Sequence, residues 1–183
     1  MSDLTERGVR RNEIFEGKVL RVVKDYILLP NGRAAEREFC IHIGAVAVLP
    51  LLSDGRVIME RQYRYAHSRV FLEIPAGKLD FSDEPPRAAA ERELLEETGA
   101  VADSYTFLGE LDTTPAITNE KIYLYLARGL SMRERSLDED EFIDLEFIHI
   151  NELYEMVMRG EIKDAKTQIA VLKTKEILKN EEK

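Results

Sequence analysis

One stretch, Gly77–Ala100, restricts what this chain can fold into more than any other part of the sequence. Its first half is polar and acidic, and its second half begins with two prolines and continues with helix-forming alanine, leucine, arginine and glutamate. Proline is tolerated in the first turn of a helix, and glycine favours the left-handed conformation that ends one. The stretch therefore predicts a loop and then a helix that ends at Gly99, with Ser82 or Asp83 as its N-cap.

Three acids of this helix are spaced so that they lie on one face. Glu93, Glu96 and Glu97 stand at i, i+3 and i+4, while Leu94 and Leu95 fall roughly on the opposite face. We expect exposed carboxylates that repel one another and that a hard divalent cation such as Mg²⁺ would hold together. The alternative is a solvated acidic face of an ordinary amphipathic helix.

The same stretch resembles the Nudix box, Gly-x5-Glu-x7-Arg-Glu-U-x-Glu-Glu-x-Gly-U, in which U is an aliphatic residue. Gly77 matches the first glycine, Glu84 matches the first glutamate, and Arg92–Gly99 match the helical part. Two positions depart from the pattern, because six residues separate Gly77 from Glu84 and Ala100 stands for the last aliphatic residue. So many residue types in register make this a strong signal.

Segments outside the box resemble the ADP-ribose pyrophosphatase branch of Nudix hydrolases over most of residues 40–178. Pro115 stands 16 residues after Gly99, where that branch is associated with a proline, although Ala116-Ile117 replaces its frequent Gly-Phe. The other similar segments are Arg61–Tyr65, Leu72–Lys78, Glu120–Leu124, Asp138–Glu141 and Asp164–Thr167.

The order of apolar and turn-forming segments predicts a mixed α/β sandwich. Residues 1–12 are polar and predicted to be loose, two antiparallel strands follow before Cys40, and further strands lie on both sides of the acidic helix. Asn151 and Asp164 are predicted N-caps of two later helices. The resemblance implies the Nudix αβα sandwich with a mixed central sheet, over residues 41–183, and a dimerising N-terminal antiparallel β segment at residues 1–40.

The resemblance also implies a reaction, the hydrolysis of ADP-ribose to AMP and ribose 5-phosphate with two or three Mg²⁺ or Mn²⁺ ions per site. The implied metal ligands are Glu93, Glu97, Glu96 and the backbone carbonyl of Ala76. Arg92 and Glu96 belong to the implied catalytic set, with Arg92 orienting the carboxylates through Glu84. A surface pair between Arg92 and Glu96 is the alternative for that arginine.

The acidic run at 138–141 is where the resemblance implies a general base. Glu141 is preferred over Glu139, and a solvated acidic turn is the alternative. Arg61 and Arg64 are candidates to bind the diphosphate, because guanidinium groups bind phosphate oxygens bidentately. Glu73 is the third candidate substrate residue, and a strand-end salt bridge between it and the arginines is the alternative.

The composition of the chain limits the kinds of molecule that it is expected to bind. The 183 residues carry a net charge of −9, which argues against nucleic acid or an anionic membrane surface as a partner. Cys40 is the only cysteine, and the longest apolar run, Ile41–Leu52, is shorter than the roughly 20 residues of a membrane span. We expect a cytoplasmic protein without an internal disulfide, and the resemblance implies a homodimer.

Two other functions stay open at this point. Another nucleoside-diphosphate sugar, a GDP- or UDP-hexose, could replace ADP-ribose as substrate. A non-catalytic Nudix-fold sensor of ADP-ribose is the alternative from a different class, which the retained acids of the box disfavour. The sequence does not indicate the base-binding residues, the preferred metal or the ion count.

Overall fold

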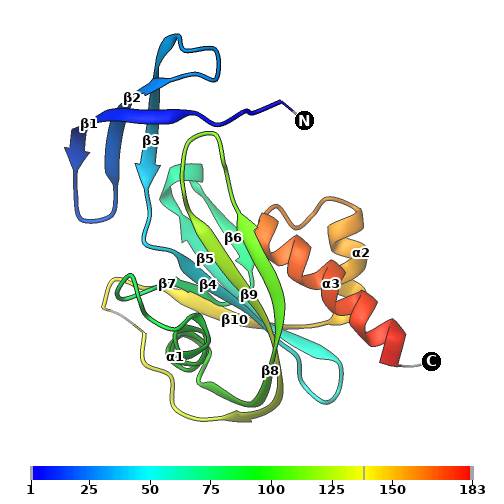
Figure 1. Cartoon of the computed structure of the whole chain (residues 1–183). Helices are drawn as coiled ribbons and strands as arrows, with labels where there is room; N and C mark the ends of the chain where they lie inside the picture. The colour runs from blue at the N-terminus through cyan, green and yellow to red at the C-terminus, as the bar shows by residue number, and fades with distance from the viewer. Residues whose placement is uncertain (1, 138, 182–183) are drawn as a thin grey trace. The chain divides into compact units, whose positions relative to one another are not determined.

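The computed structural model describes residues 2–137 and 139–181 (Figure 1). These residues form two compact units. The first comprises the chain up to Ile43 together with Asp112–Lys121, and the second comprises Gly44–Leu111 together with the chain from Ile122 onward.

The first unit is an antiparallel sheet of order β1-β2-β3, so the predicted N-terminal antiparallel β segment is confirmed. Its strands are β1 (Arg7–Glu16), β2 (Arg21–Leu28) and β3 (Ala34–Ile41). The predictions of two strands and of a loose segment at 1–12 were wrong, because β1 begins at Arg7. Strand β1 is almost wholly exposed and is held by pairing with β2 and by ion pairs such as Arg11–Asp25, at 2.7 Å. Its few apolar residues are exposed and do not alternate regularly with polar ones, so no sequence pattern marked this strand.

The second unit contains two sheets. Strand β4 runs parallel to β9 and antiparallel to β7 in a sheet of order β7-β4-β9-β8, which confirms the predicted mixed sheet. A three-stranded antiparallel sheet has the order β10-β5-β6. The strands are β4 (Ala45–Pro50), β5 (Arg56–Arg64), β6 (Arg69–Glu73), β7 (Ala76–Lys78), β8 (Ala100–Asp112), β9 (Lys121–Met132) and β10 (Ile143–His149), with a 3₁₀ turn η1 (Tyr65–His67) between β5 and β6.

Helix α1 (Pro86–Thr98) lies on one face of the strands, and α2 (Ile150–Met158) and α3 (Ala165–Glu181) lie on the other (Figure 1). Strand β4 explains this division, because successive side chains point to opposite faces of a strand. Val46 and Val48 belong to the apolar cluster that contains α1 residues, whereas Leu49 belongs to the cluster that contains residues of α2 and α3. The result is the predicted αβα sandwich.

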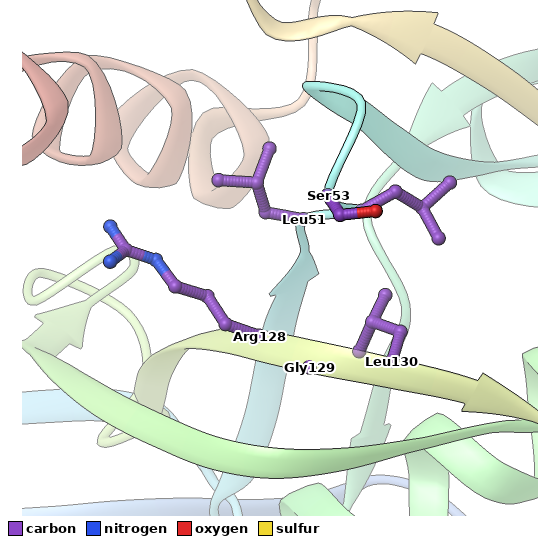
Figure 2. Close-up of a pocket in the computed structure, with 6 residues that line it drawn as sticks. Leu51, Ser53, Arg128, Gly129 and Leu130 are labelled. Atoms are coloured by element: carbon purple, nitrogen blue, oxygen red, sulfur yellow. The ribbon is translucent and has the colours of Figure 1, made fainter.

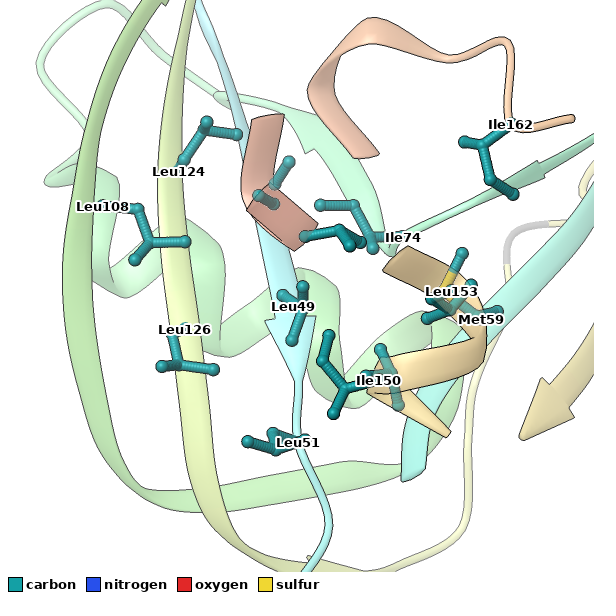
Figure 3. Packing of buried hydrophobic residues seen from close by; sticks show 14 of the residues in the cluster. Leu49, Leu51, Met59, Ile74, Leu108, Leu124, Leu126, Ile150, Leu153 and Ile162 are labelled. Atoms are coloured by element: carbon teal, nitrogen blue, oxygen red, sulfur yellow. The ribbon is translucent and has the colours of Figure 1, made fainter. Parts of the chain in front are cut away.

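The larger cluster is shown in Figure 3, where leucines of β4 and β9 face the side of α2. Leu49 and Leu126 are fully buried there, and Leu153 of α2 is fully buried in the same cluster. This packing positions the β4–β7 edge that carries the site described below.

The N-caps predicted for two helices were wrong. Helix α1 begins after Pro85, whose fixed φ already suits the first turn, and no side chain caps it, so neither Ser82 nor Asp83 has that role. Helix α2 is capped by His149, which accepts a hydrogen bond from the backbone N–H of Asn151 at 3.2 Å.

Two other helix ends agree with the sequence. Gly99 ends α1 in the left-handed conformation, with φ of 74°. Asp164 caps α3, since its Oδ2 accepts a hydrogen bond from the backbone N–H of Thr167 at 2.9 Å.

We expect Leu94→Ala to lower the free energy of unfolding by about 2–5 kcal/mol. The Leu94 side chain of α1 is fully buried against the sheet, so its truncation leaves a cavity. The matched control is Leu172→Ala on α3, where the leucine is 40% exposed and a substantially smaller loss follows. Denaturant unfolding of both variants measures this difference. Equal losses would contradict the burial of α1 against the sheet.

Candidate functional site

The three acids of the box on α1 differ in exposure. The side chain of Glu96 is 44% exposed, that of Glu93 is 12% exposed, and Glu97 is buried with 4% of its surface accessible. The expectation of three exposed carboxylates was therefore wrong for Glu93 and Glu97. Glu97 follows Ala90 by seven residues and Leu94 by three, so it falls on the buried stripe of the helix.

The two less exposed acids, Glu93 and Glu97, lie against strand β7. The backbone N–H of Ala76 donates a hydrogen bond to Glu97 Oε2 at 2.9 Å. A methyl group on Gly77 would lie 2.0 Å from the carboxyl carbon of Glu93, so only glycine lets this carboxyl group lie directly against the strand. The glycine that opens the box therefore leaves space for one of its glutamates.

Arg92 ties the loop to the helix. Its Nη1 donates to Glu93 Oε1 at 2.8 Å and to Glu96 Oε2 at 3.1 Å, and its Nε lies 3.3 Å from Glu84 Oε1. The loop with the extra residue is closed from the other side, because the backbone N–H of Asp80 donates to Glu84 Oε2 at 2.7 Å. One guanidinium thus contacts three acids of the box.

The electrostatics of the site favour a positive ligand. Burial, and after it the charges of Glu60, Glu93 and Glu141, raise the pKa of Glu97 to about 10. Burial also raises the pKa of Glu93, although Arg92 opposes that shift. Without a cation, a proton neutralises Glu97 at neutral pH.

Glu60 on β5 is a member of this group that the sequence reasoning missed. It is 3% exposed, and burial together with the charge of Glu73 raises its pKa to about 8. The available signal was an acid placed directly after the apolar run Val57–Met59 in a predicted strand, where a charge is rarely buried without a reason.

Glu73 lies opposite Glu60 across β5 and β6 and has the reverse environment. Arg64 binds it with two hydrogen bonds, of 2.7 and 3.0 Å, and the buried Lys166 of α3 donates to Oε2. Burial acts to raise the pKa of Glu73, but these cationic partners outweigh it and hold the pKa below its usual value. Lys166 is anchored in turn by Asp164 at 3.0 Å.

The remaining sequence candidates are placed differently. Glu141 is partly buried, and its charge raises the pKa of Glu60, Glu93 and Glu97, whereas Glu139 is exposed. Asp138, the first acid of that run, lies outside the described residues.

Arg61 and Arg64 differ in surroundings, although both belong to β5. Alternation along the strand points Arg61 away from the face of Glu60 and Arg64. Arg61 is exposed and pairs with Glu146 at 3.3 Å. The structure brings Arg64, but not Arg61, to the side of the strand that carries the acids.

The donor chemistry of this group fits a hard divalent cation. In residues 2–137 and 139–181, no three acidic, histidine or cysteine side chains stand close enough to hold an ion as they lie. The Arg92 guanidinium occupies Glu93 and Glu96, so a cation would have to displace or share it. Low exposure, carboxylate oxygens and the raised pKa values of Glu93 and Glu97 nevertheless describe a site where Arg92 does not offset the whole negative charge.

A cavity of about 210 Å³ lies elsewhere, at the end of β4 and along β9 (Figure 2). Its lining contains none of the acids described above, so it is separate from the candidate site. The lining residues are Leu51, Leu52, Ser53, Arg128, Gly129 and Leu130. Within the described chain, no helix combines the length and apolar character needed to cross a membrane.

Known proteins resemble this chain over nearly its whole length. A model of the NUDIX domain matches residues 41–169. The methanol dehydrogenase activator of Bacillus methanolicus is 40% identical over 179 residues, covering 96% of each chain. The ADP-ribose pyrophosphatase of Bacillus subtilis (strain 168) is 40% identical over 182 residues, which are 97% of this chain and 98% of that protein. A crystal structure of an ADP compounds hydrolase has the same fold, with a TM-score of 0.88 at 22% identity over 99% of this chain and 98% of that one.

We expect Gly77→Ala to weaken Mn²⁺ binding about 10-fold or more, because the added methyl group must displace the Glu93 carboxyl group. The fold should tolerate the change, since the displaced atoms end a flexible side chain. The control is Gly8→Ala on β1, where a methyl group meets no atom within 4 Å. Electron paramagnetic resonance of free Mn²⁺ gives the affinity, and thermal unfolding reports on the fold. Unchanged affinity in a folded Gly77→Ala protein would separate Glu93 from the cation site.

Proposed function

We propose, since this chain belongs to the NUDIX family, that it hydrolyses the diphosphate bond of ADP-ribose to give AMP and ribose 5-phosphate. The observation that carries the proposal is the pair of glutamates, Glu93 and Glu97, that α1 sets against β7 with raised pKa values. The likeness to an ADP-ribose pyrophosphatase over almost the whole chain supports the choice of substrate.

The proposal includes Mg²⁺ or Mn²⁺, two or three ions per site, held by Glu93, Glu97, Glu96 and the carbonyl oxygen of Ala76. Such ions, when bound, polarise phosphoryl oxygens and acidify a water molecule. Arg92 acts on the ligands rather than on the substrate, because its nitrogens contact the acids of the box. It sets the spacing of Glu93 and Glu96 on the helix.

Glu141 is the proposed general base, which takes a proton from the attacking water. It is partly buried and its charge acts on three acids of the site, whereas Glu139 is exposed. A base at this place adds to the negative potential that a cation would offset.

For substrate binding we propose Arg64 and Arg61, with Glu73 holding Arg64 in place. The Arg64 side chain is 41% exposed, and Glu73 binds its Nε and Nη2, so Nη1 remains to donate to a diphosphate. Arg61 pairs only loosely, at 3.3 Å, and can leave Glu146 for an anion.

A cytoplasmic location and the absence of a nucleic-acid partner belong to the same proposal. They are supported by the net charge of −9 and the single cysteine.

The substrate is tested by incubating the full chain and Mg²⁺ with ADP-ribose, GDP-hexoses and UDP-hexoses and identifying both products. We expect ADP-ribose to give the highest kcat/KM, with AMP and ribose 5-phosphate formed in equal amounts. Faster turnover of a GDP- or UDP-hexose would overturn the substrate assignment. Tight binding of ADP-ribose without any turnover would identify a sensor.

We expect Glu97→Gln to lower kcat about 100-fold or more, because a ligand charge is lost at the reacting centre. The amide oxygen of glutamine can still accept the Ala76 hydrogen bond, so the fold should persist. The matched control is Glu91→Gln on the exposed side of the same helix, where the glutamate pairs with Arg87. Near-normal turnover of Glu97→Gln, or a loss that only follows unfolding, would remove Glu97 from the ligand set.

For the base, we expect Glu141→Gln to lower kcat about 100-fold or more while KM changes little, because only the proton-transfer step is affected. Glu139→Gln should have a smaller effect, since that side chain is exposed. Steady-state kinetics of both variants decide between them, and the reverse ranking would assign the base to Glu139.

A homodimer built through residues 1–40 is the last part of the proposal. Val9, Ile14 and Leu20 in this segment are 64%, 58% and 52% exposed, more apolar surface than a small sheet ordinarily leaves in water. We expect a dimer by light scattering and loss of both dimerisation and substrate affinity when residues 1–40 are deleted. Ile14→Arg tests the same surface in the intact chain. A monomeric full-length protein with a normal KM would refute the dimer.

A further inference from the structure

Glu60 is a buried carboxylate with an unused oxygen. Only 3% of the residue is exposed, and Oε1 has no hydrogen-bond partner among the atoms of the described residues. A buried polar atom without a partner is costly, so its persistence calls for a reason.

The side chain of Glu60 points toward α1. Ile58 lies two residues earlier and packs in the cluster that contains Leu94 of α1, so alternation places Glu60 on the same face of β5. Leu145, the cross-strand partner of Glu60 on β10, packs against that cluster as well. Residues directly opposite in a sheet share a face, which gives the same direction independently.

The side chain of Glu97, on α1, lies in the layer between that helix and the strands, on the face toward which Glu60 points. Its oxygen Oε2 accepts a hydrogen bond from the Ala76 N–H, and Glu60 is the carboxyl group whose charge acts on it most strongly. Two nearly inaccessible carboxyl groups, one from β5 and one from α1, therefore act on each other.

A comparison with Glu73 shows that burial on these strands does not by itself leave a carboxyl oxygen without a partner. Glu73 is the cross-strand neighbour of Glu60 and equally buried, yet Arg64 and Lys166 satisfy its oxygens. The attraction of these cations for Glu60 is smaller than the combined effect of its burial and of the Glu73 charge. Among the described residues, no such partner reaches Oε1 of Glu60.

We propose that Glu60 is a further ligand residue for a divalent cation shared with Glu97, using Oε1 directly or through one bound water molecule. The assignment rests on the proposed function, because it extends the cation site from the box helix to strand β5. Glu60 would thereby hold the cation against strand β5. A strand within a sheet moves less than a loop, so this ligand would be fixed in position.

The test uses Mn²⁺ alone with the full-length chain. Electron paramagnetic resonance of free Mn²⁺ gives affinity and stoichiometry for wild type, Glu60→Gln and the control Glu155→Gln, which changes an exposed acid of α2. We expect Glu60→Gln to bind Mn²⁺ about 10-fold or more weakly, or to lose one ion, while the control is unchanged. In chelator, its melting temperature should stay close to that of wild type, because glutamine has nearly the same size and shape as glutamate.

A purely structural role predicts a different result. If Glu60 only shares a proton with Glu97, Glu60→Gln leaves Mn²⁺ affinity and stoichiometry unchanged, and that outcome overturns the proposal. Should Glu60→Gln fail to fold, Glu60→Leu replaces the acid with an apolar side chain of similar size that suits this buried face, and the same Mn²⁺ criterion applies.

The outcome is separable from the proposed reaction. Wild-type protein that hydrolyses ADP-ribose while Glu60→Gln binds Mn²⁺ normally would overturn the Glu60 assignment alone. Weakened Mn²⁺ binding by Glu60→Gln in a wild-type protein that leaves ADP-ribose intact would overturn the substrate and support the ligand.

Discussion

The hydrogen bond from the Ala76 N–H to Glu97 is the contact on which the site depends. It joins β7 to α1 and holds a glutamate inside the protein, where a carboxylate would otherwise be expelled into water. Gly77 allows the second acid, Glu93, to lie against the same strand. The rest of the fold, with α1 packed on β4 through Leu94, keeps strand and helix in this position.

The buried acids of this chain fall into two groups, which differ in how much positive charge surrounds them. Glu73 is neutralised internally by Arg64 and Lys166, and its pKa is lowered by them against the effect of burial. Glu60 and Glu97 are left with too little positive charge, and burial raises the pKa of each. Ion pairs within the protein hold Glu73 in a fixed position, whereas buried acids without enough positive charge nearby favour the binding of a cation. Glu60 and Glu73, one from each group, are cross-strand partners on β5 and β6.

Some elements followed directly from residue pattern, and others did not. Helix α1, its end at Gly99 and the cap at Asp164 depend on neighbours in sequence, and local rules were sufficient for them. The cap of α1 was misassigned because Pro85 sets the start without a side-chain hydrogen bond. Strand β1 escaped detection because ion pairs and strand pairing, not buried apolar residues, hold it.

By itself, the sequence determined the spacing of the box acids, the loop and helix that carry them, and the alternation that divides β4 between two layers. Only the tertiary structure decided that Glu97 is buried, that Arg64 lies with the acids while Arg61 does not, and that Glu60 is buried beside Glu73. The physical reason is that periodicity indicates which residues share a face, but burial and charge compensation depend on what packs against that face. Those partners come from strands and helices distant in sequence, which no local pattern specifies.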